Sequence, residues 1–385
     1  MMLVPSCIRS WRTTLTPFVM FTGLSDLTIV IPTVSRPLFV LRQFEYWCET
    51  DANIVILDGA KEPLLIPEGL KCANVQYVHT GTRFNERLAT AGSFVKTKYC
   101  ALLTDDEFFL PSGLLAAIRR LETDPTIIGC VGRNLFFFVD QGRFLVSDAY
   151  REWTPFPAGC ERLEDRLDAD LPPNKTHKAQ FAIMRRTQWV EMFSRSYSIF
   201  FSSGYTYERL LNLSRSVQGR TEILEELIWM RSMENPPISS VNVPRRGTGD
   251  FVTWATSEDF KSEIETYRSI ALEMLRRGGL DEEKARQYEE RFFVGGIQRQ
   301  ASKQARNARS LRRKFAKLLL TRTPRRLRLL AKRIAPNRVL RFTGWQGFEL
   351  QEMCQSLTAR NTSFVRGELD RIADLSLRLH KKIHG

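Results

Sequence analysis

A buried apolar run that ends in three consecutive acids constrains the fold of this chain more than any other feature. Residues 99–103 (YCALL) have the length and apolar character of an interior strand, and Asp105, Asp106 and Glu107 follow after one threonine. Pro111 then stands where a helix would begin. Ligands of α/β sheets bind at the carboxyl ends of the strands, so this order predicts a binding site around the three acids.

Two earlier segments repeat the order of a strand followed by polar residues. Residues 27–32 (LTIVIP) form an apolar run, which leads through Thr33 and Arg36 into a helical pattern over residues 38–48. Residues 53–58 (NIVILD) form another apolar run, which itself ends in an acid. Strands that alternate with helices predict an α/β fold, in which a mostly parallel sheet is flanked by helices.

The motifs LTIVIPTVSRP, VILDGA and YCALLTDDEFFLPSGL, in this order, resemble the family-2 branch of the GT-A glycosyltransferases. Within that branch the chain is similar to bacterial and phage proteins that carry a glycosyltransferase domain, over about residues 25–235. The resemblance implies a Rossmann-like GT-A fold. It also implies a hexosyltransferase-type enzyme, which moves a sugar from a nucleotide-sugar donor, a UDP-sugar by preference, to a hydroxyl of a glycan, lipid-linked or protein acceptor.

The three acids are the candidate metal ligands. Adjacent carboxylates at a strand end repel one another, and a divalent cation such as Mn²⁺ or Mg²⁺ relieves that repulsion. We expect Asp105, Asp106 and Glu107 to hold such an ion against the diphosphate of the donor. The D-x-D motif of the family can be placed on these acids in more than one register. If it is aligned on Pro111, it falls on residues 104–106 and lacks its first acid. Asp106 is the acid that is present in either register. The alternative is a solvated acidic turn without a metal.

The expected donor-binding residues lie at strand ends or on the helices that follow them. Asp58 stands at a strand end, where it can accept a hydrogen bond from a ribose or a base. Arg87 lies on a helix predicted over residues 82–98, and the alternative for this residue is a solvent-facing arginine. The resemblance implies the following donor-binding set: Pro32, Thr33, Arg36, Asp58, Arg87 and Asp105.

The candidate catalytic base lies on a helix predicted over residues 205–213. The resemblance implies a Glu-Asp pair near the start of such a helix, and the motif YER around Glu208 keeps the acid but has arginine in place of the aspartate. We expect Glu208 to take the proton of the acceptor hydroxyl, with inversion, while Asp106 acts on the leaving nucleotide. Without a base, a retaining mechanism stays open. Two rival bases lie on a second predicted helix, over residues 221–233: Glu222 and Glu225.

Positive charge is concentrated near the C-terminal end of the chain. The 385 residues carry a net charge of +14, yet residues 291–348 hold 17 Lys and Arg and no acid, so the rest of the chain is slightly acidic. Together with the motifs, this distribution predicts four parts. They are an N-terminal segment (1–24), the glycosyltransferase domain (25–250), a helical extension (251–300) and a basic amphipathic helical tail (301–385).

The composition of the basic tail predicts that it makes a peripheral contact and takes no part in catalysis. Residues 306–341 place leucines along one helical face between Lys and Arg, a pattern typical of helices that lie on anionic membranes. Self-association is the alternative. Nucleic-acid binding is disfavoured, because the apolar stripe is rich in leucine rather than in stacking aromatics. We therefore expect a cytoplasmic protein, with a peripheral contact to the inner face of a membrane, and the oligomeric state stays open.

The cysteines, the hydropathy and the N-terminal segment predict that several features are absent. The seven cysteines are scattered and form no C-x-x-C pair, so we expect small buried side chains in a reducing compartment rather than disulfides or a zinc site. No apolar run reaches the ~18 residues of a transmembrane helix. The N-terminal segment lacks a small-residue cleavage site, so no signal peptide is expected.

The sequence also predicts a loop over the active site, and it leaves two alternative functions to be weighed. Residues 151–178 are rich in proline and predict a long loop over the site. The alternative function is a catalytically degenerate transferase fold that binds membrane or nucleic acid through its tail, since the D-x-D motif and the YER motif both depart from the family. A nucleotidyltransferase would need a glycine-rich basic loop after the first strand, and residues 33–37 do not form one.

Overall fold

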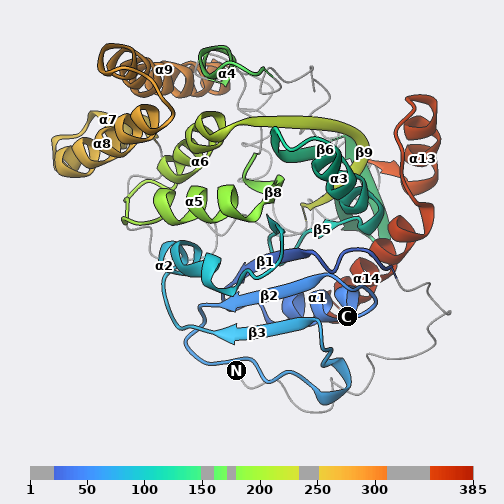
Figure 1. The fold of residues 1–385 in the computed structure, drawn as a ribbon. Helices are drawn as coiled ribbons and strands as arrows, with labels where there is room; N and C mark the ends of the chain where they lie inside the picture. The colour runs from blue at the N-terminus through green and yellow to red at the C-terminus, as the bar shows by residue number, and fades with distance from the viewer. Residues whose placement is uncertain (1–20, 149–159, 171–178, 234–250, 310–346, 385) are drawn as a thin grey trace.

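The computed structural model describes residues 21–148, 160–170, 179–233, 251–309 and 347–384. One sheet runs through the molecule, and helices cover both of its faces (Figure 1). The predicted α/β class is therefore confirmed. No helix in these ranges is long and apolar enough to cross a membrane.

Four parallel strands form the Rossmann-like half of the sheet, in the order β3-β2-β1-β4. Every residue of β1 is buried, as expected of a strand that is covered on both faces. Because the four strands run in one direction, their carboxyl ends meet at one edge of the sheet. The strands are β1 (Leu27–Thr33), β2 (Asn53–Asp58), β3 (Val75–His79) and β4 (Tyr99–Leu102), and β1, β2 and β4 coincide with the three predicted apolar runs.

The other half of the sheet is mixed in direction. Strands β6 and β7 form an antiparallel hairpin through a turn in which Gln141 and Gly142 both have positive φ angles, of 51° and 74°. The remaining long strand, β9, runs parallel to β6. The six strands are β5 (Phe108–Phe109), β6 (Ile127–Asp140), β7 (Arg143–Asp148), β8 (Ile183–Arg185), β9 (Arg220–Ser232) and β10 (Phe348–Glu349).

Helices connect the strands and form both outer layers. Two of them, over residues 37–47 and 205–218, begin at or within one residue of the predicted positions, because each presents an apolar stripe to the core. Short 3₁₀ turns lie at Glu68–Leu70, Ala91–Phe94, Ala179–Phe181 and Glu258–Phe260. The α-helices are α1 (Pro37–Trp47), α2 (Phe84–Thr90), α3 (Pro111–Thr123), α4 (Leu163–Asp170), α5 (Arg186–Ser196), α6 (Tyr205–Gln218), α7 (Phe251–Thr256), α8 (Lys261–Arg277), α9 (Glu282–Arg309), α13 (Leu350–Ala359) and α14 (Arg366–His384).

Apolar side chains form two cores, one on each face of the sheet. Along β1 the side chains alternate between them: Ile29 and Ile31 belong to the core that contains Trp47 of α1, and Val30 belongs to the core under α5 and α6. Each fully buried side chain of this size contributes about 1.5–3 kcal/mol to folding. Strand β1, which ends at Thr33, is thus packed against apolar side chains on both faces.

Three predictions of secondary structure are wrong. Residues 221–233 form β9 rather than a helix, because they pair with β6 along most of its length, and the apolar spacing of a short run suits either structure. The helix predicted over 82–98 ends at Thr90. The chain turns just beyond it, where Gly92 packs so closely against α5 that a Cβ atom on residue 92 would lie 2.7 Å from the side chain of Val190. The segment predicted as a loop over 151–178 contains α4, and the rest of it lies outside the described residues.

The last described segment is part of the main core. β10 pairs with β7, and α14 packs along α1, where Arg378 Nη2 lies 2.6 Å from Glu45 Oε1. Apolar residues of α13 and α14 join the core that contains Ile29.

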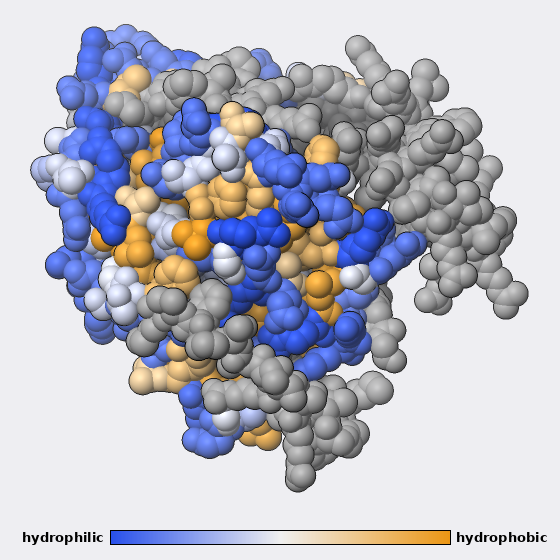
Figure 2. Space-filling view, turned by 90° about the vertical axis from the view of Figure 1, so that its right-hand side faces the viewer, coloured by the Kyte–Doolittle hydropathy of each residue, from blue (hydrophilic) through white to orange (hydrophobic). Residues whose placement is uncertain are grey.

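On the side of the molecule that carries α13, hydrophilic residues predominate and hydrophobic residues gather near the middle of the face (Figure 2). The predicted membrane contact at 306–341 lies almost wholly outside the described residues.

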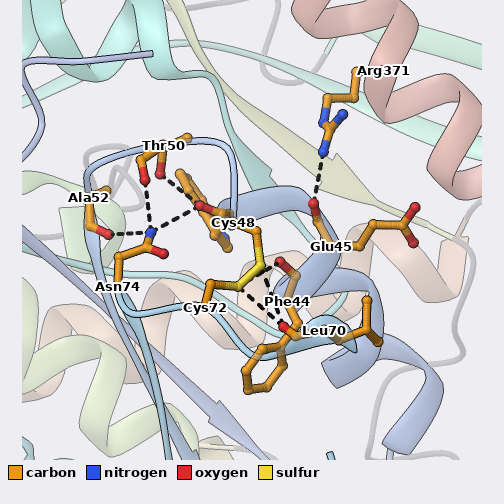
Figure 3. Close-up of a disulfide and its surroundings, with 10 residues drawn as sticks. Phe44, Glu45, Cys48, Thr50, Ala52, Leu70, Cys72, Asn74 and Arg371 are labelled. Atoms are coloured by element: carbon orange, nitrogen blue, oxygen red, sulfur yellow. Dashed lines mark hydrogen bonds between the residues drawn. A yellow bond between two sulfur atoms is a disulfide. The ribbon is translucent and has the colours of Figure 1, made fainter. Parts of the chain in front are cut away.

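One pair of cysteines contradicts the expectation of free thiols. Cys48, just after α1, forms a disulfide with Cys72, just before β3, and their Cα atoms are 5.6 Å apart (Figure 3). The side-chain amide of Asn74 stabilises the same region by donating hydrogen bonds to three backbone carbonyl oxygens, those of Trp47, Thr50 and Ala52. The pair was missed because a separation of 24 residues forms no recognisable motif. Cys100, Cys130 and Cys354 are free and buried, as expected, and Cys160 is free and half-buried.

Candidate active site

Polar residues from three strand ends meet at the carboxyl edge of the parallel strands. Thr33 of β1 is the register partner of Asp58 of β2. The hydroxyl of Thr33 donates a hydrogen bond of 2.6 Å to Asp105 Oδ2, just beyond β4. Thr33, Asp58 and Asp105 are all buried. The structure therefore brings together residues of three motifs that the sequence separates by up to 72 positions.

Arg36 joins the two acids that follow β4. It lies in the turn between β1 and α1, next to Ser35, whose φ of 54° lets the chain reverse sharply. Its guanidinium donates to Asp105 Oδ1 through Nη1 and to Asp106 Oδ2 through Nη2, the latter at 2.9 Å. The same group lies 4.6 Å from the ring centre of Phe39. A single arginine thus neutralises part of the charge of both carboxylates.

Helix α1 holds the backbone of the acidic segment. Three of its side chains, which the sequence analysis did not single out, donate hydrogen bonds to carbonyl oxygens of residues 105–109. Polar residues within an otherwise apolar stripe were the signal that could have identified them. The bonds run from Arg42 Nη2 to Asp106 O (2.8 Å), from Gln43 Nε2 to Asp105 O (2.9 Å) and Glu107 O (2.8 Å), and from Tyr46 Oη to Phe109 O (2.7 Å).

Glu107 points away from the other two acids. Its Oε2 accepts a hydrogen bond of 2.9 Å from the indole Nε1 of Trp229, and its Oε1 lies 3.5 Å from Arg231 Nε. The ring of Phe181 stacks on Trp229, with ring centres 4.4 Å apart. Trp229 and Arg231 belong to β9, so the incorrect helix prediction for this segment concealed their place in the site.

Burial raises the pKa of both buried acids. For Asp105 the loss of water is the largest cause and raises the pKa to about 6, although the positive charge of Arg36 opposes the rise. For Glu107 burial raises the pKa to about 8, and the charge of Asp106 adds to the effect. Glu107 is therefore mostly uncharged at neutral pH, unlike a glutamate on the surface.

The described residues do not form the predicted three-carboxylate metal site. A divalent cation needs several oxygen ligands that converge on one point. Asp105 and Asp106 converge on Arg36 instead, and Glu107 is directed to β9. Across the described ranges, no three His, Cys, Asp or Glu side chains are grouped so that they could hold a metal ion. The dependence on Mn²⁺ or Mg²⁺ stays a prediction, and this arrangement of the acids does not fit it.

Asp58 and Arg87 lie together at the ends of β2 and β3. Asp58 accepts hydrogen bonds from Tyr77 Oη at 2.6 Å and from the Ala60 amide at 2.8 Å. Burial, followed by the hydrogen bond to Asp58, raises the pKa of Tyr77 to about 12. Arg87 is buried and packs so closely on Gly59 that a Cβ atom there would overlap its guanidinium. The alternative of a solvent-facing Arg87 is therefore wrong.

Glu208 lies in the first turn of α6, beside a cluster of aromatic rings. The ring of Tyr197 stacks on Tyr207 at 4.6 Å and meets Phe84 of α2 edge-on at 5.9 Å. Burial raises the pKa of Tyr197 well above its usual range, and the charge of Glu208 adds to the rise, so the carboxylate is close to this phenol. The role of Glu208 as the base stays a prediction.

The two rival bases, Glu222 and Glu225, form ion pairs with elements that neighbour β9. Glu222 Oε2 lies 2.7 Å from Nη2 of Arg120 on α3, and Glu225 forms an ion pair with Arg133 of β6. Both acids are at least one-third exposed, so the pairs are typical surface pairs. Their contacts hold β9 to its neighbours and give no reason to prefer them to Glu208.

Exposed apolar side chains surround the start of α6. We call Phe84, Ile199, Phe200 and Tyr205 the aromatic rim, and between 39% and 47% of each is exposed. The guanidinium of Arg83 lies 5.5 Å from the ring centre of Phe200. Apolar groups of this size at one place on a surface often mark a binding site. No pattern in the sequence predicted the rim.

A groove of about 680 Å³ between α5 and α8 is not the candidate site. It includes Arg186, whose amide bonds to Lys98 just before β4, so the groove begins at the amino ends of the parallel strands. Its charged side chains pair with one another: Glu273 Oε1 lies 3.3 Å from Arg195 and 2.8 Å from Arg277. The carboxyl edge of the sheet remains the better candidate.

Comparison with known proteins found no related sequence and only solved structures of low similarity. No protein family and no curated protein matches the sequence. A structure of S. aureus TarS aligns over 83% of this chain, with 12% identity and a TM-score of 0.43, and the chain spans only 52% of that TarS chain. TarS 1–349 in complex with UDP-GlcNAc aligns over 93% of this chain and 91% of its own (11% identity, TM-score 0.44), and the UDP complex aligns over 93% and 90% (10% identity, TM-score 0.43). Likeness at this level concerns the course of the chain and not its chemistry.

Proposed function

We propose that this protein is a glycosyltransferase that uses a nucleotide-sugar donor, a UDP-sugar in the first instance. One observation carries the proposal: Thr33, Arg36, Asp58, Asp105 and Asp106 meet at the carboxyl edge of the parallel strands. This is the edge at which open α/β sheets bind nucleotides. The sequence motifs that resemble family-2 glycosyltransferases are the motifs that supply these residues.

In this proposal the donor lies across the ends of β1, β2 and β4. Asp58 accepts a hydrogen bond from the ribose or the base, and buried Arg87 supports the charge of Asp58 from α2. Pro32 and Thr33 form the floor of the site at the end of β1. The guanidinium of Arg36 contacts the diphosphate, for which its planar set of N–H donors is suited. Asp105 and Asp106 hold Arg36 in position.

The acceptor is placed beside α6. Glu208 takes the proton of the acceptor hydroxyl, whose oxygen forms a bond to the anomeric carbon as the bond from that carbon to the diphosphate breaks. The product is inverted at the anomeric carbon, and a nucleoside diphosphate leaves. The aromatic rim offers apolar ring faces next to Glu208, which suits the C–H surface of a glycan or of a lipid-linked sugar. No step of this scheme requires a divalent cation, because Arg36 binds both Asp105 and Asp106.

A screen of nucleotide-sugars tests the proposal. Binding of UDP, UDP-GlcNAc, UDP-glucose and GDP-mannose is measured by calorimetry, and donor hydrolysis is followed by chromatography. We expect one nucleotide to bind and Asp58→Ala to weaken its binding by about tenfold, because the donor loses a hydrogen bond to a charged group. The matched control is Asp148→Asn, which changes the ion pair between Asp148 of β7 and Arg360 at the end of α13. If no nucleotide-sugar binds, the proposal is wrong.

A non-catalytic binding protein is the second candidate. It is favoured by the arginine that follows Glu208 and by the pairing of Arg36 with two acids that were expected to hold a metal. The same screen separates the two candidates. Binding of a nucleotide without hydrolysis or transfer, in the presence of a panel of glycan acceptors, would support the binding protein, whereas turnover that Glu208→Gln abolishes would support the enzyme.

A further inference from the structure

The charges around the acidic segment are already balanced by the chain itself. Arg36 binds the carboxylates of Asp105 and Asp106, and buried Arg42 donates to the carbonyl oxygen of Asp106. Two guanidinium charges therefore face two carboxylate charges. A divalent cation between the same two acids would produce the same balance.

Arg36 is held in this position by contacts on several sides. Its two acid partners are nearly buried, with 3% and 16% of their side chains exposed, while 19% of Arg36 itself is exposed. Phe39 lies beneath its guanidinium, and Pro37 restricts the backbone of Arg36, the residue that precedes it. Since α1 also fixes the carbonyl oxygens of the acidic segment, the arginine and its partners form a preorganised unit.

The remaining N–H groups of Arg36 suit a phosphate. An arginine carries more N–H donors than its two carboxylate partners use here, and its planar fork matches phosphate oxygens. Because the guanidinium is partly exposed at the edge where the donor is placed, these groups are accessible to a diphosphate. Asp106, the more exposed of the two acids, would otherwise repel that diphosphate, and its bond to Arg36 reduces the repulsion.

We propose that Arg36 supplies the positive charge that binds the diphosphate of the donor, and that Asp105 and Asp106 hold this arginine in place of a divalent ion. The inference rests on the proposed function and makes it more specific: nucleotide binding does not depend on a metal. A divalent ion at the acid pair would have to displace Arg36 from both carboxylates.

Two binding measurements test this inference without reference to turnover. Calorimetry gives the affinity for UDP in EDTA and in Mn²⁺, and electron paramagnetic resonance gives the amount of bound Mn²⁺. We expect the wild type to bind UDP equally well in both solutions. Arg36→Gln should lose about tenfold or more in EDTA, since a charge-assisted contact is removed. The same variant should gain a Mn²⁺ site, and adding Asp106→Asn should remove that site again.

Controls separate the possible failures. Arg133→Gln, which removes an arginine from an ion pair elsewhere on the sheet, should change neither measurement. If Arg36→Gln does not fold, the wild type decides: a Mn²⁺ site that Asp106→Asn abolishes, together with loss of UDP binding in EDTA, would overturn the inference and leave the glycosyltransferase proposal intact. If the wild type binds UDP in neither solution nor any other nucleotide of the screen, the proposed function itself fails.

Discussion

The indole of Trp229 donates a hydrogen bond of 2.9 Å to Glu107, and this contact separates Glu107 from the two acids that precede it. Three adjacent carboxylates in the sequence thus become two groups with different partners. Asp105 and Asp106 face α1 and the end of β1, while Glu107 faces β9. The bond links the candidate site to a strand that lies more than 100 positions further along the chain.

Replacement of Trp229 tests the importance of this bond. Trp229→Phe keeps the aromatic contact with Phe181 but leaves a buried carboxyl without its donor, so we expect the free energy of unfolding to fall by about 1–3 kcal/mol. Urea denaturation measures the change. In a double-mutant cycle with Glu107→Leu, the two effects should be coupled by about 1 kcal/mol. Trp254→Phe, which affects a different hydrogen bond in the second core, should be additive with Glu107→Leu.

Removal of the Gln43 amide should damage both stability and nucleotide binding. Gln43 is fully buried and donates to two carbonyl oxygens, those of Asp105 and Glu107. Gln43→Leu keeps the volume but leaves both oxygens without this donor, so we expect a loss of about 2–5 kcal/mol in the free energy of unfolding. UDP affinity, measured at a temperature where the variant is folded, should also decrease, because the acidic segment loses its support. Unchanged affinity would show that α1 does not position the site.

The disulfide between Cys48 and Cys72 should be detectable and stabilising. Because it closes a loop of 24 residues, the double variant Cys48→Ser, Cys72→Ser should lose about 3 kcal/mol. Mass spectrometry of peptides from protein purified without reductant should find the two cysteines linked. Buried Cys100 serves as the control, since it should stay unmodified by an alkylating agent in the folded protein. Complete alkylation of Cys48 and Cys72 in the native state would contradict the bond.

Glu368 should make stability fall as the pH rises. This residue of α14 is buried and accepts hydrogen bonds from the amide and the hydroxyl of Ser112, and burial raises its pKa above the usual 4.5. The folded state therefore retains a proton that the unfolded chain has released, so the contribution of Glu368 is present below pH 4.5 and decreases as the pH rises through the raised pKa.

The comparison with Glu368→Gln isolates this effect from other titrating groups. The difference in the free energy of unfolding between the wild type and the variant is measured in urea from pH 4 to pH 8. We expect this difference to move in favour of the variant as the pH increases. A difference that does not change with pH would mean that Glu368 has the same pKa in the folded and the unfolded chain.

Local sequence patterns were sufficient for the parallel half of the sheet. The strands β1, β2 and β4 are short apolar runs bounded by polar residues, and α1 has a stripe of apolar residues at helical spacing, so each can be recognised from its own segment. The positions of Thr33, Asp58 and Asp105 at the same edge then follow from the parallel direction of the strands.

Non-local contacts explain what the sequence did not predict. β9 has an apolar spacing that suits a helix as well as a strand, and only its pairing with β6 makes it a strand. The link between Cys48 and Cys72 depends on where α1 ends relative to β3. Arg42 and Gln43 stand out as polar residues in an apolar stripe, but their partners could not be predicted, because these are backbone carbonyl oxygens on a distant segment.

The sequence by itself determined the α/β class and the set of polar residues that follow the strands, because both depend on local order and periodicity. Only the tertiary structure decided which groups those residues meet. The turn before α1 brings Arg36 to Asp105 and Asp106, and the pairing of β9 brings Trp229 to Glu107. Side-chain partners across a sheet depend on the register and the direction of each strand, and neither can be predicted from three neighbouring acids in the sequence.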